Sequence, residues 1–353
     1  MRNSTHVCSS ESGCLQPEGD EPVRREAHHG RNKIKSMGDH RIEISRDGKR
    51  VTVQALHVRD KDIISSGRTV RIARIHDEEW LATELEDPEA CMKELRRSGL
   101  SADLFTFTQK PPDTTPRYGY PVVLESIAAA RTADFQGWWQ SLPQETRKNV
   151  RRSQKRGVVV TVNPFEDELV KGIAAVNNES RMRQGRANKH YGKSLDEVRK
   201  DHESFVDRSD FVCAYLEREL IGYLKLVYRG GVASILNIVS KTSHHDKRPS
   251  NALLAKAMEL CNAKGLSHLI YGKYYYGKKR NSQLLDFKVR HGFCEILMPR
   301  FYVPLTKWGE VCLRLKLYRT FFEIVPPEII EMGLRVRAQW YNARNRCAGV
   351  AQW

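Results

Sequence analysis

"FVCAYLERELIGYLKLVYRGGVASILNIVS", residues 211–240, is the stretch that decides the fold of this chain. Three segments rich in apolar and β-branched residues are separated by two short polar turns, "ERE" at 217–219 and "RGG" at 229–231. Such segments predict strands, and turns this short join strands that run antiparallel to each other. We therefore predict a three-stranded antiparallel meander.

The elements on either side of the meander follow a simple order. Residues 249–265, "PSNALLAKAMELCNAKG", have proline near the first turn and glycine as a stop, which predicts a helix. A strand (266–272), a helix (281–292) and a last strand (295–305) follow. Before the meander lie a basic helix (146–156) that ends at Gly157 and a strand (158–162). A helix that runs into a basic, polar loop (165–186) and another helix (194–206) follow. Ser141 and Gln144 have capping-box spacing at the start of the basic helix.

Four regions are predicted from these patterns. Residues 1–40 are polar, have almost nothing to bury and are expected to be disordered. Residues 41–135 mix alternating strands with one helix and predict a small α/β lobe. Residues 136–306 form the lobe that contains the meander, and residues 307–353 are a basic, amphipathic helical tail.

Composition narrows the class of protein. The 353 residues include 59 Lys and Arg against 43 Asp and Glu, a formal net charge of +16, which favours an anionic partner. No apolar run approaches the length of a membrane span, and no secretory signal is evident in the first 40 residues, so we expect a soluble, cytoplasmic protein. The eight cysteines have no zinc-site spacing, which predicts reduced thiols and no metal.

The order of meander, helix, strand, helix and final strand resembles the core of GNAT-superfamily acyltransferases. It is most similar to the Fem-type branch, the aminoacyltransferases of cell-wall precursors, and to their acetyltransferase-like relatives. The matching stretches are "RKNVRRSQKRGVVV", "LIGYLKLVY", the helix start at Pro249, "HLIYG" and "LLDFKVRHGF" followed by "YVPL", within residues 130–306. The resemblance implies an α/β fold with a mixed, mainly antiparallel GNAT-like sheet flanked by helices, preceded by a smaller, truncated GNAT-like lobe.

The resemblance also implies an activity, which is the transfer of an acyl or aminoacyl group from a thioester or an aminoacyl ester to an amine. The donor is then an acyl-CoA or an aminoacyl-tRNA. In GNAT enzymes the turn after the fourth strand is glycine-rich and holds the pyrophosphate of coenzyme A. Here that turn is "HHDKRPSNALL", and Lys247, Arg248, Ser250 and Asn251 are the residues that could hold a phosphate. The alternative is an ordinary helix cap with solvated charges.

The basic helix offers a second anion site. Arg147, Arg151 and Lys155 form one row at i, i+4 and i+8, with Arg152 in the adjacent row. Like charges stacked in this way destabilise a helix, so a compensating anion is expected. By resemblance to Fem-type proteins, the anion is a phosphate-bearing acceptor. A solvated face pinned by tertiary packing is the alternative.

Two residues are candidates for the chemistry. Lys288 stands five residues before the Phe of "HGF", where GNAT enzymes often carry a tyrosine acid, and the Fem-type pattern has a lysine that neutralises charge on the reacting carbonyl or phosphate. Glu179 could accept the proton of the amine if its pKa is raised. The alternatives are a lysine that snorkels from the helix and a helix-surface carboxylate paired with Arg183 at i+4.

Other segments allow further contacts with a partner. The polar stretch around Arg183 predicts a binding loop. Tyr274, within "YGKYYYGKKRN", either stacks on a base or sugar or packs inward at the end of a strand. The C-terminal tail either lies on an anionic membrane or covers the first lobe. A non-catalytic protein that binds RNA, including tRNA, or a nucleotide-linked sugar in the same basic groove is the alternative function.

Overall fold

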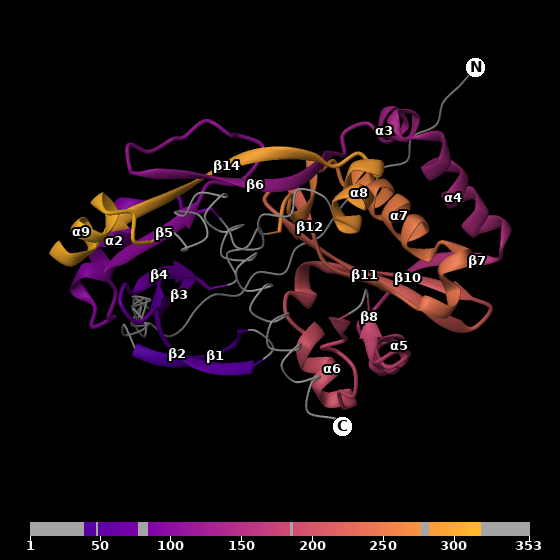
Figure 1. The fold of residues 1–353 in the computed structure, drawn as a ribbon, viewed down its shortest axis with the longest axis horizontal. Coiled ribbons are helices and arrows are strands. Elements are labelled where there is room, and N and C mark those ends of the chain that lie inside the picture. Colours follow the sequence, from indigo (N-terminus) through magenta and orange to yellow (C-terminus); the bar gives the residue numbers. More distant parts are fainter. Residues whose placement is uncertain (1–38, 47–48, 77–83, 184–185, 277–281, 319–353) are drawn as a thin grey trace, which may run out of the picture. The chain divides into compact units, whose positions relative to one another are not determined.

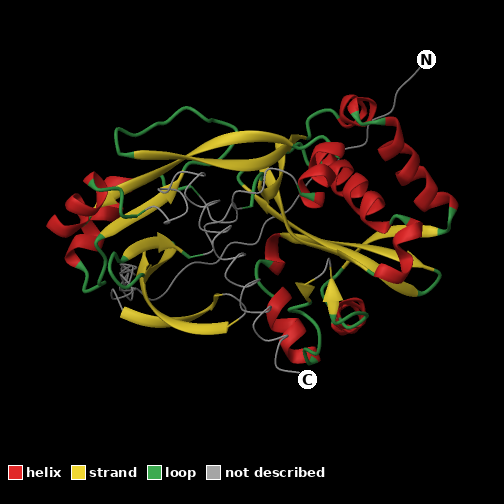
Figure 2. Ribbon diagram, in the orientation of Figure 1, coloured by secondary structure: helices red, strands yellow, loops and turns green. Residues whose placement is uncertain are grey.

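The computed structural model describes residues 39–46, 49–76, 84–183, 186–276 and 282–318 (Figure 1). Within these residues, 12 strands form one mixed sheet, and a short hairpin forms a second sheet (Figure 2). The strand order in the main sheet is β1-β2-β3-β4-β5-β14-β6-β13-β12-β11-β10-β7. Only β4–β5 and β12–β13 pair in parallel. The predicted α/β class with a mainly antiparallel sheet is confirmed.

The N-terminal part of the sheet is built from short, alternating strands. The helix α2 packs on it, and its N-cap Asp87 accepts a hydrogen bond from the backbone N–H of Ala90. The elements are β1 (Asp39–Arg46), β2 (Lys49–Val58), β3 (Lys61–Ser66), β4 (Ile72–Ile75), α2 (Pro88–Arg97), β5 (Leu104–Thr108) and β6 (Val122–Arg131).

The C-terminal part holds the predicted meander and its helices. The turns lie at residues 217–218 and 230–231, within the expected stretches 217–219 and 229–231. The elements are α3 (Phe135–Ser141), α4 (Gln144–Lys155), β7 (Val158–Asn163), α5 (Asp167–Asn177), β8 (Met182–Arg183), β9 (Arg186–Ala187), α6 (Leu195–His202), η1 (Val206–Arg208), β10 (Ser209–Leu216), β11 (Glu219–Arg229), β12 (Val232–Ser240), η2 (Thr242–Lys247), α7 (Pro249–Ala263), β13 (His268–Lys273), α8 (Gln283–Arg290), β14 (Cys294–Pro304) and α9 (Lys307–Arg314).

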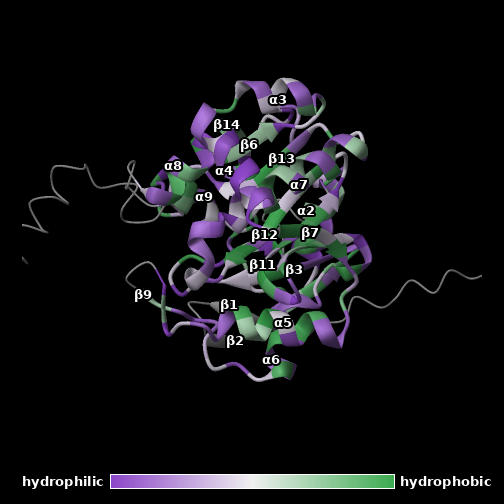
Figure 3. Ribbon diagram, turned by 90° about the vertical axis from the view of Figure 1, so that its right-hand side faces the viewer, coloured by the Kyte–Doolittle hydropathy of each residue, from purple (hydrophilic) through white to green (hydrophobic). Residues whose placement is uncertain are grey.

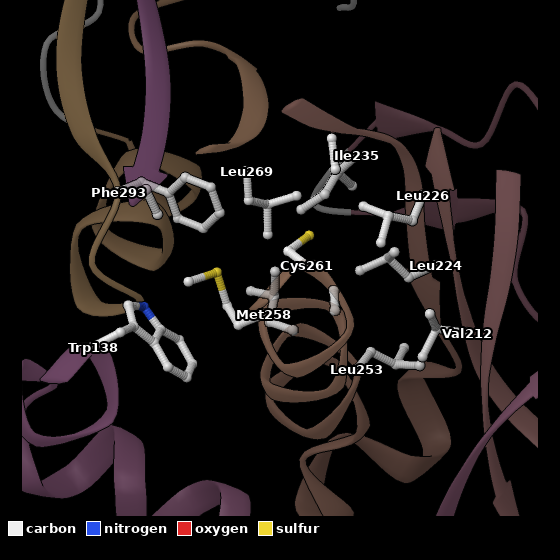
Figure 4. Close-up of a cluster of buried hydrophobic side chains, with 14 of the residues drawn as sticks. Trp138, Val212, Leu224, Leu226, Ile235, Leu253, Met258, Cys261, Leu269 and Phe293 are labelled. Atoms are coloured by element: carbon white, nitrogen blue, oxygen red, sulfur yellow. The ribbon is translucent and has the colours of Figure 1, made fainter. Parts of the chain in front are cut away.

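Both faces of the meander are covered, which explains why its strands read as nearly continuous apolar runs. On one face α7 inserts Leu253, Met258 and Cys261 against sheet residues such as Leu224 and Leu269 (Figure 4). On the other face α5 and α6 pack on a separate cluster that includes Ile173 and Phe211. Figure 3 colours the meander strands largely green, for hydrophobic residues, and most of α4 purple. The central strands are thus fixed from both sides.

The last strand joins the two predicted lobes. β14 lies between β5 and β6 and pairs antiparallel with both (Figure 1). β6 precedes the boundary predicted at residues 135–136, yet it pairs with β13 and β14 of the second lobe. The sheet therefore continues across that boundary. A partly buried ion pair, Arg300 Nε to Glu125 at 2.9 Å, crosses from β14 to β6.

Three local expectations need correction or lie outside the described residues. The N-cap of α4 is Pro143 and makes no side-chain cap bond, and Ser141 instead donates its hydroxyl to the carbonyl of Trp138, so the capping box is wrong. α5 ends at Asn177, where the helix runs into the predicted polar loop, because the residues that follow offer no apolar face. Nearly all of the 1–40 tail and residues 319–353 fall outside the description.

The start of the C-terminal tail is described. α9 packs beside the N-terminal part of the sheet, where Trp308 donates its indole N–H to the carbonyl of Thr69 at 3.2 Å. Gly309 approaches so closely that a Cβ would stand 2.0 Å from the carbonyl oxygen of Asp103. This part of the tail covers the first lobe, one of the two alternatives considered. None of the helices within the described ranges has the length and apolarity to span a membrane.

Candidate active site

The site begins where two parallel strands separate. β12 and β13 pair only from Val232–Ser234 to His268–Ile270, although β12 runs on to Ser240 and β13 to Lys273. The register of β11 against β12 jumps between Lys225 and Leu226, which leaves Leu236 as a bulge, and a bulge bends its strand. We call residues 236–240 and 271–273 the strand parting. The carboxyl ends of neighbouring parallel strands are where open α/β sheets bind ligands.

Lys288 lies at the strand parting. Its side chain is fully buried on α8, and Nζ donates a hydrogen bond of 2.6 Å to the carbonyl oxygen of Lys273. The rings of Tyr271 and Tyr276 stand 4.7 Å from Nζ, from ring centroid to nitrogen. Burial lowers the pKa of Lys288 to about 8, because desolvation disfavours the charged form. The snorkelling lysine considered from the sequence is therefore wrong.

The predicted phosphate turn connects β12 to α7. Arg248 is exposed and adopts the left-handed conformation with φ 58°, which favours glycine. Lys247 donates to the carboxylate of Asp246 at 2.9 Å, so its charge already has a partner. The hydroxyl of Ser250 lies 3.0 Å from that of Ser240. Of the two cations predicted to hold a phosphate here, Arg248 is the one without an ion pair among the described residues.

Asn251, the fourth predicted residue of the turn, is held by a histidine. Its Nδ2 lies 2.9 Å from Nε2 of His291, and Nδ1 of His291 lies 2.7 Å from the carbonyl oxygen of Phe287. Burial lowers the pKa of His291 to about 4, so its imidazole is neutral at physiological pH. The α7 N-terminus is thereby attached to the end of α8, where His291 stands three residues after Lys288.

The basic helix α4 lies beside the same turn. Arg156, at the end of α4, donates to both the carbonyl and the carboxylate of Asp246. Arg151 points its guanidinium at the ring of Trp139, 5.7 Å from the centroid, and lines a cavity of about 550 Å³ between α3, α4, β7 and α7. Asp246 therefore links the two predicted anion sites.

The other predicted residues of α4 differ in their environment. Arg152 donates to the side-chain oxygen of Asn149 at 3.2 Å. The Nε of Arg147 is buried and has no hydrogen-bond partner. Among the described residues, Arg147, Arg151 and Arg152 form no ion pair with a carboxylate. A row of cations without counter-charge is electrostatically ready for an anion.

Glu179 has a structural environment that differs from the expected one. Its carboxylate accepts hydrogen bonds from the backbone N–H groups of Thr242 and Ser243 and from the hydroxyl of Ser243. Burial alone would raise its pKa, but these bonds and the nearby charge of Arg183 hold the pKa below its usual value. The expected raised pKa is therefore wrong, because hydrogen bonds to the charged form favour it. Glu179 fixes the start of η2.

Two more predicted residues, Arg183 and Tyr274, make contacts within the protein. Arg183 is on β8 and donates to the carbonyl of Val176 at 2.8 Å. It is not a helical i+4 partner of Glu179, since α5 has already ended. Tyr274 packs against the α7-side core and edge-on to Tyr275, with ring centroids 4.9 Å apart. Its backbone N–H donates to the carbonyl of Ser126. The inward-packing alternative fits Tyr274 better than base stacking.

A second buried lysine lies on the other face of the sheet. Lys225 on β11 is fully buried and donates to the carbonyls of His202 and Ser204, and burial lowers its pKa to about 8. We did not predict it, although a lone lysine within the apolar run "LIGYLKLVY" was a signal. His202 and Asn237, which lie beside it, were also missed. A histidine at the end of a polar helix gives no sequence sign of burial.

Comparisons with known proteins agree with this arrangement at the level of fold. No protein-family model and no curated protein sequence matches the chain. The crystal structure of FemX matches with a TM-score of 0.51 and 11% identity, covering 74% of this chain and 88% of that one. L-PGS from Bacillus licheniformis matches with a TM-score of 0.46 and 14% identity, over 74% and 87%.

A third match covers a smaller part of this chain. The PaiA N-acetyltransferase from Thermoplasma acidophilum, solved with coenzyme A, matches with a TM-score of 0.30 and 17% identity, covering 40% of this chain and 98% of that one. Identities this low establish only a shared fold. The likeness to FemX confirms the Fem-type fold that the order of elements predicted.

Proposed function

We propose that this chain is an N-acyltransferase that moves an acyl or aminoacyl group from a thioester or an aminoacyl ester to an amine. The observation that carries the proposal is a desolvated lysine, Lys288, whose ammonium is bound to the last carbonyl of β13 at the strand parting. A buried cation interacts with developing negative charge far more strongly than an exposed one. The FemX-like fold is consistent with the proposal but does not carry it.

The chemistry assigned to the residues is simple. The amine nitrogen attacks the donor carbonyl and forms the C–N bond, and the carbonyl oxygen becomes negatively charged. The ammonium of Lys288, which predominates below its pKa of about 8, stabilises that charge. The C–S or C–O bond of the donor then breaks, and the proton lost by the amine goes to the leaving group or to water. Glu179 has no part in this scheme.

The cations of α4 are assigned to the acceptor. Arg147 and Arg151 present positive charge without a carboxylate partner among the described residues, and Arg151 borders a cavity with the indole of Trp139. A phosphate-bearing acceptor would supply the missing counter-charge. Arg152, whose guanidinium also contacts Asn149, extends the same surface.

The turn between β12 and α7 offers few groups that could hold the diphosphate of an acyl-CoA donor. Arg248 and Pro249 stand where backbone N–H groups would otherwise approach a diphosphate, and Asp246 adds a negative charge beside them. We therefore expect weak binding of acyl-CoA, and we include aminoacyl-tRNA as the alternative donor. Micromolar binding of acetyl-CoA that is unchanged by Arg248→Ala would contradict this view of the turn.

Thermal stabilisation separates the acyltransferase from an RNA-binding module. We expect acyl-CoA and UDP-sugar compounds to raise the melting temperature more than a generic RNA oligomer does at physiological salt. An RNA-binding protein would show the reverse order, with stabilisation that falls steeply as salt rises. That second result would replace the proposed function with nucleic-acid binding.

A further inference from the structure

Two histidine–asparagine pairs of the same design flank the strand parting. Asn251 and His291 form the first, on the α7 side, as described above. In the second, Nδ2 of Asn237 on β12 lies 3.1 Å from Nε2 of His202, and Nδ1 of His202 lies 2.9 Å from the carbonyl oxygen of Val198. In both pairs the histidine contacts the carbonyl four residues earlier on its own helix. The second pair has no role in the scheme above.

The backbone carbonyl decides which nitrogen of His202 carries the proton. A carbonyl oxygen only accepts, so Nδ1 must be the N–H, and Nε2 is left as an acceptor. Burial lowers the pKa of His202, which keeps the ring neutral. The hydroxyl of Tyr223 lies 3.2 Å from the same Nε2 and 3.3 Å from Oδ1 of Asn177. An acceptor at Nε2 requires the NH₂ group of Asn237 to point toward it.

The orientation of Asn237 is therefore fixed. With its NH₂ group toward His202, its carboxamide oxygen points the other way. Asn237 is only half-buried, and within the described part of the chain no hydrogen bond reaches that oxygen. Asn237 lies three residues beyond Ser234, where pairing with β13 ends, and it is opposite Lys225 in the register. A neutral acceptor of fixed direction thus lies at the strand parting, on the face opposite α7.

We infer that Asn237 binds the acceptor amine through its carboxamide oxygen and that His202 is the residue that positions it. The inference rests on the proposed acyl transfer. An oxygen that accepts one N–H of the amine leaves the nitrogen lone pair free to attack the donor carbonyl. Because the carboxamide is neutral, it holds the amine without favouring the unreactive ammonium, as a carboxylate would.

The test measures amine binding without any donor. Glycine methyl ester is the probe, because its α-amino group is partly neutral near pH 8, and N,N-dimethylglycine methyl ester, whose neutral form has no N–H, is the control. Backbone amide signals near Val239, in spectra of the ¹⁵N-labelled full chain, report binding. We expect saturable binding of the first ester and none of the second. Equal binding of both would overturn the inference.

Variants of Asn237 and His202 test whether amine binding depends on this pair. Asn237→Ala should weaken binding of glycine methyl ester by about fivefold to tenfold, the contribution of one net hydrogen bond. His202→Phe should weaken it similarly, since the carboxamide can then rotate, and His202→Gln should restore it, because its amide oxygen can accept from Asn237. Asn163→Ala, on edge strand β7, is the matched control and should change nothing.

Two results would contradict the assignment. One is unchanged binding in Asn237→Ala, and the other is an Nε2–H tautomer of His202 in ¹⁵N imidazole spectra, a measurement that needs no variant to fold. Neither depends on turnover. Amine binding at Asn237 without acyl transfer from any donor would refute the proposed function alone, whereas acyl transfer unaffected by Asn237→Ala would refute this inference alone.

Discussion

Lys288 is the residue on which the proposed chemistry depends, and its burial makes a pH prediction. A cation that titrates at about 8 is present below that pH and lost above it. If the ammonium stabilises the transition state, the rate of acyl transfer should fall as pH rises through about 8. Single-turnover rates across pH 6–10 would measure this. Lys288→Arg should be slow but should lack the descending limb, since a guanidinium stays charged.

The second buried lysine provides the control for that experiment. Lys225 has the same pKa of about 8, but its Nζ donates to the carbonyls of His202 and Ser204 at the end of α6 and lies over the ring of Phe211. In Lys225→Met the descending limb should remain. If the fall in rate above pH 8 disappears in Lys225→Met and persists in Lys288→Arg, the titrating group is Lys225. That result would contradict the mechanism.

For single residues, the sequence predicted which residues belong to the candidate site better than it predicted their burial and contacts. The position of Lys288 followed from its spacing to the "HGF" motif, but its complete burial depends on Tyr271 and Tyr276 across the strand parting. Glu179 shows the converse, because the N–H groups that lower its pKa come from residues more than 60 positions away. Contacts of that range leave no local pattern in a sequence.

At the scale of elements, α4 makes the clearest prediction. Charge reversal at Arg147 and Arg151 should weaken binding of a phosphate-bearing probe such as UDP-N-acetylglucosamine, because it removes two unpaired cations from one row. It should also raise the melting temperature slightly by relieving repulsion along the helix. Calorimetry and thermal melts measure the two effects separately.

A second double variant, with the same net charge as the variant at Arg147 and Arg151, is the matched control. Lys93→Glu with Lys200→Glu reverses two exposed lysines on α2 and α6, far in sequence from α4. This pair should bind the probe like the wild type. Equal loss in both double variants would mean that α4 is only a solvated face and that overall charge sets the affinity.

Helices and strands were largely predictable where the period of the apolar residues and the turn residues that flank them indicate the same element. The meander, α7 and β14 have the expected order because their apolar residues face a core on known sides. The bulge at Leu236 and the early end of pairing between β12 and β13 were not predicted. Register changes of this kind are set by packing between strands and by α7. A continuous apolar run in the sequence does not indicate whether they occur.

At the scale of the whole molecule, β6 and β14 make a prediction about fragments. A fragment of residues 136–318 lacks β6, so β13 and β14 lose their shared partner, and the core loses Ala128 and Ala130. We expect it to show no cooperative thermal transition, whereas residues 120–318, which include β6, should melt cooperatively. Circular dichroism on the two fragments measures this. A cooperative melt of residues 136–318 near the temperature of the full chain would show that β6 is dispensable.

Acyl transfer itself can be followed by mass spectrometry of an amine after incubation with acyl-CoA or aminoacyl-tRNA. We expect an N-acylated product with the wild-type chain. In Lys288→Met we expect a loss of roughly 10²-fold or more in rate, the usual cost of removing a group that stabilises transition-state charge, with donor affinity nearly unchanged. Transfer at the wild-type rate in Lys288→Met, or no transfer from either donor by a chain that binds both, would contradict the proposed role of Lys288 in acyl transfer.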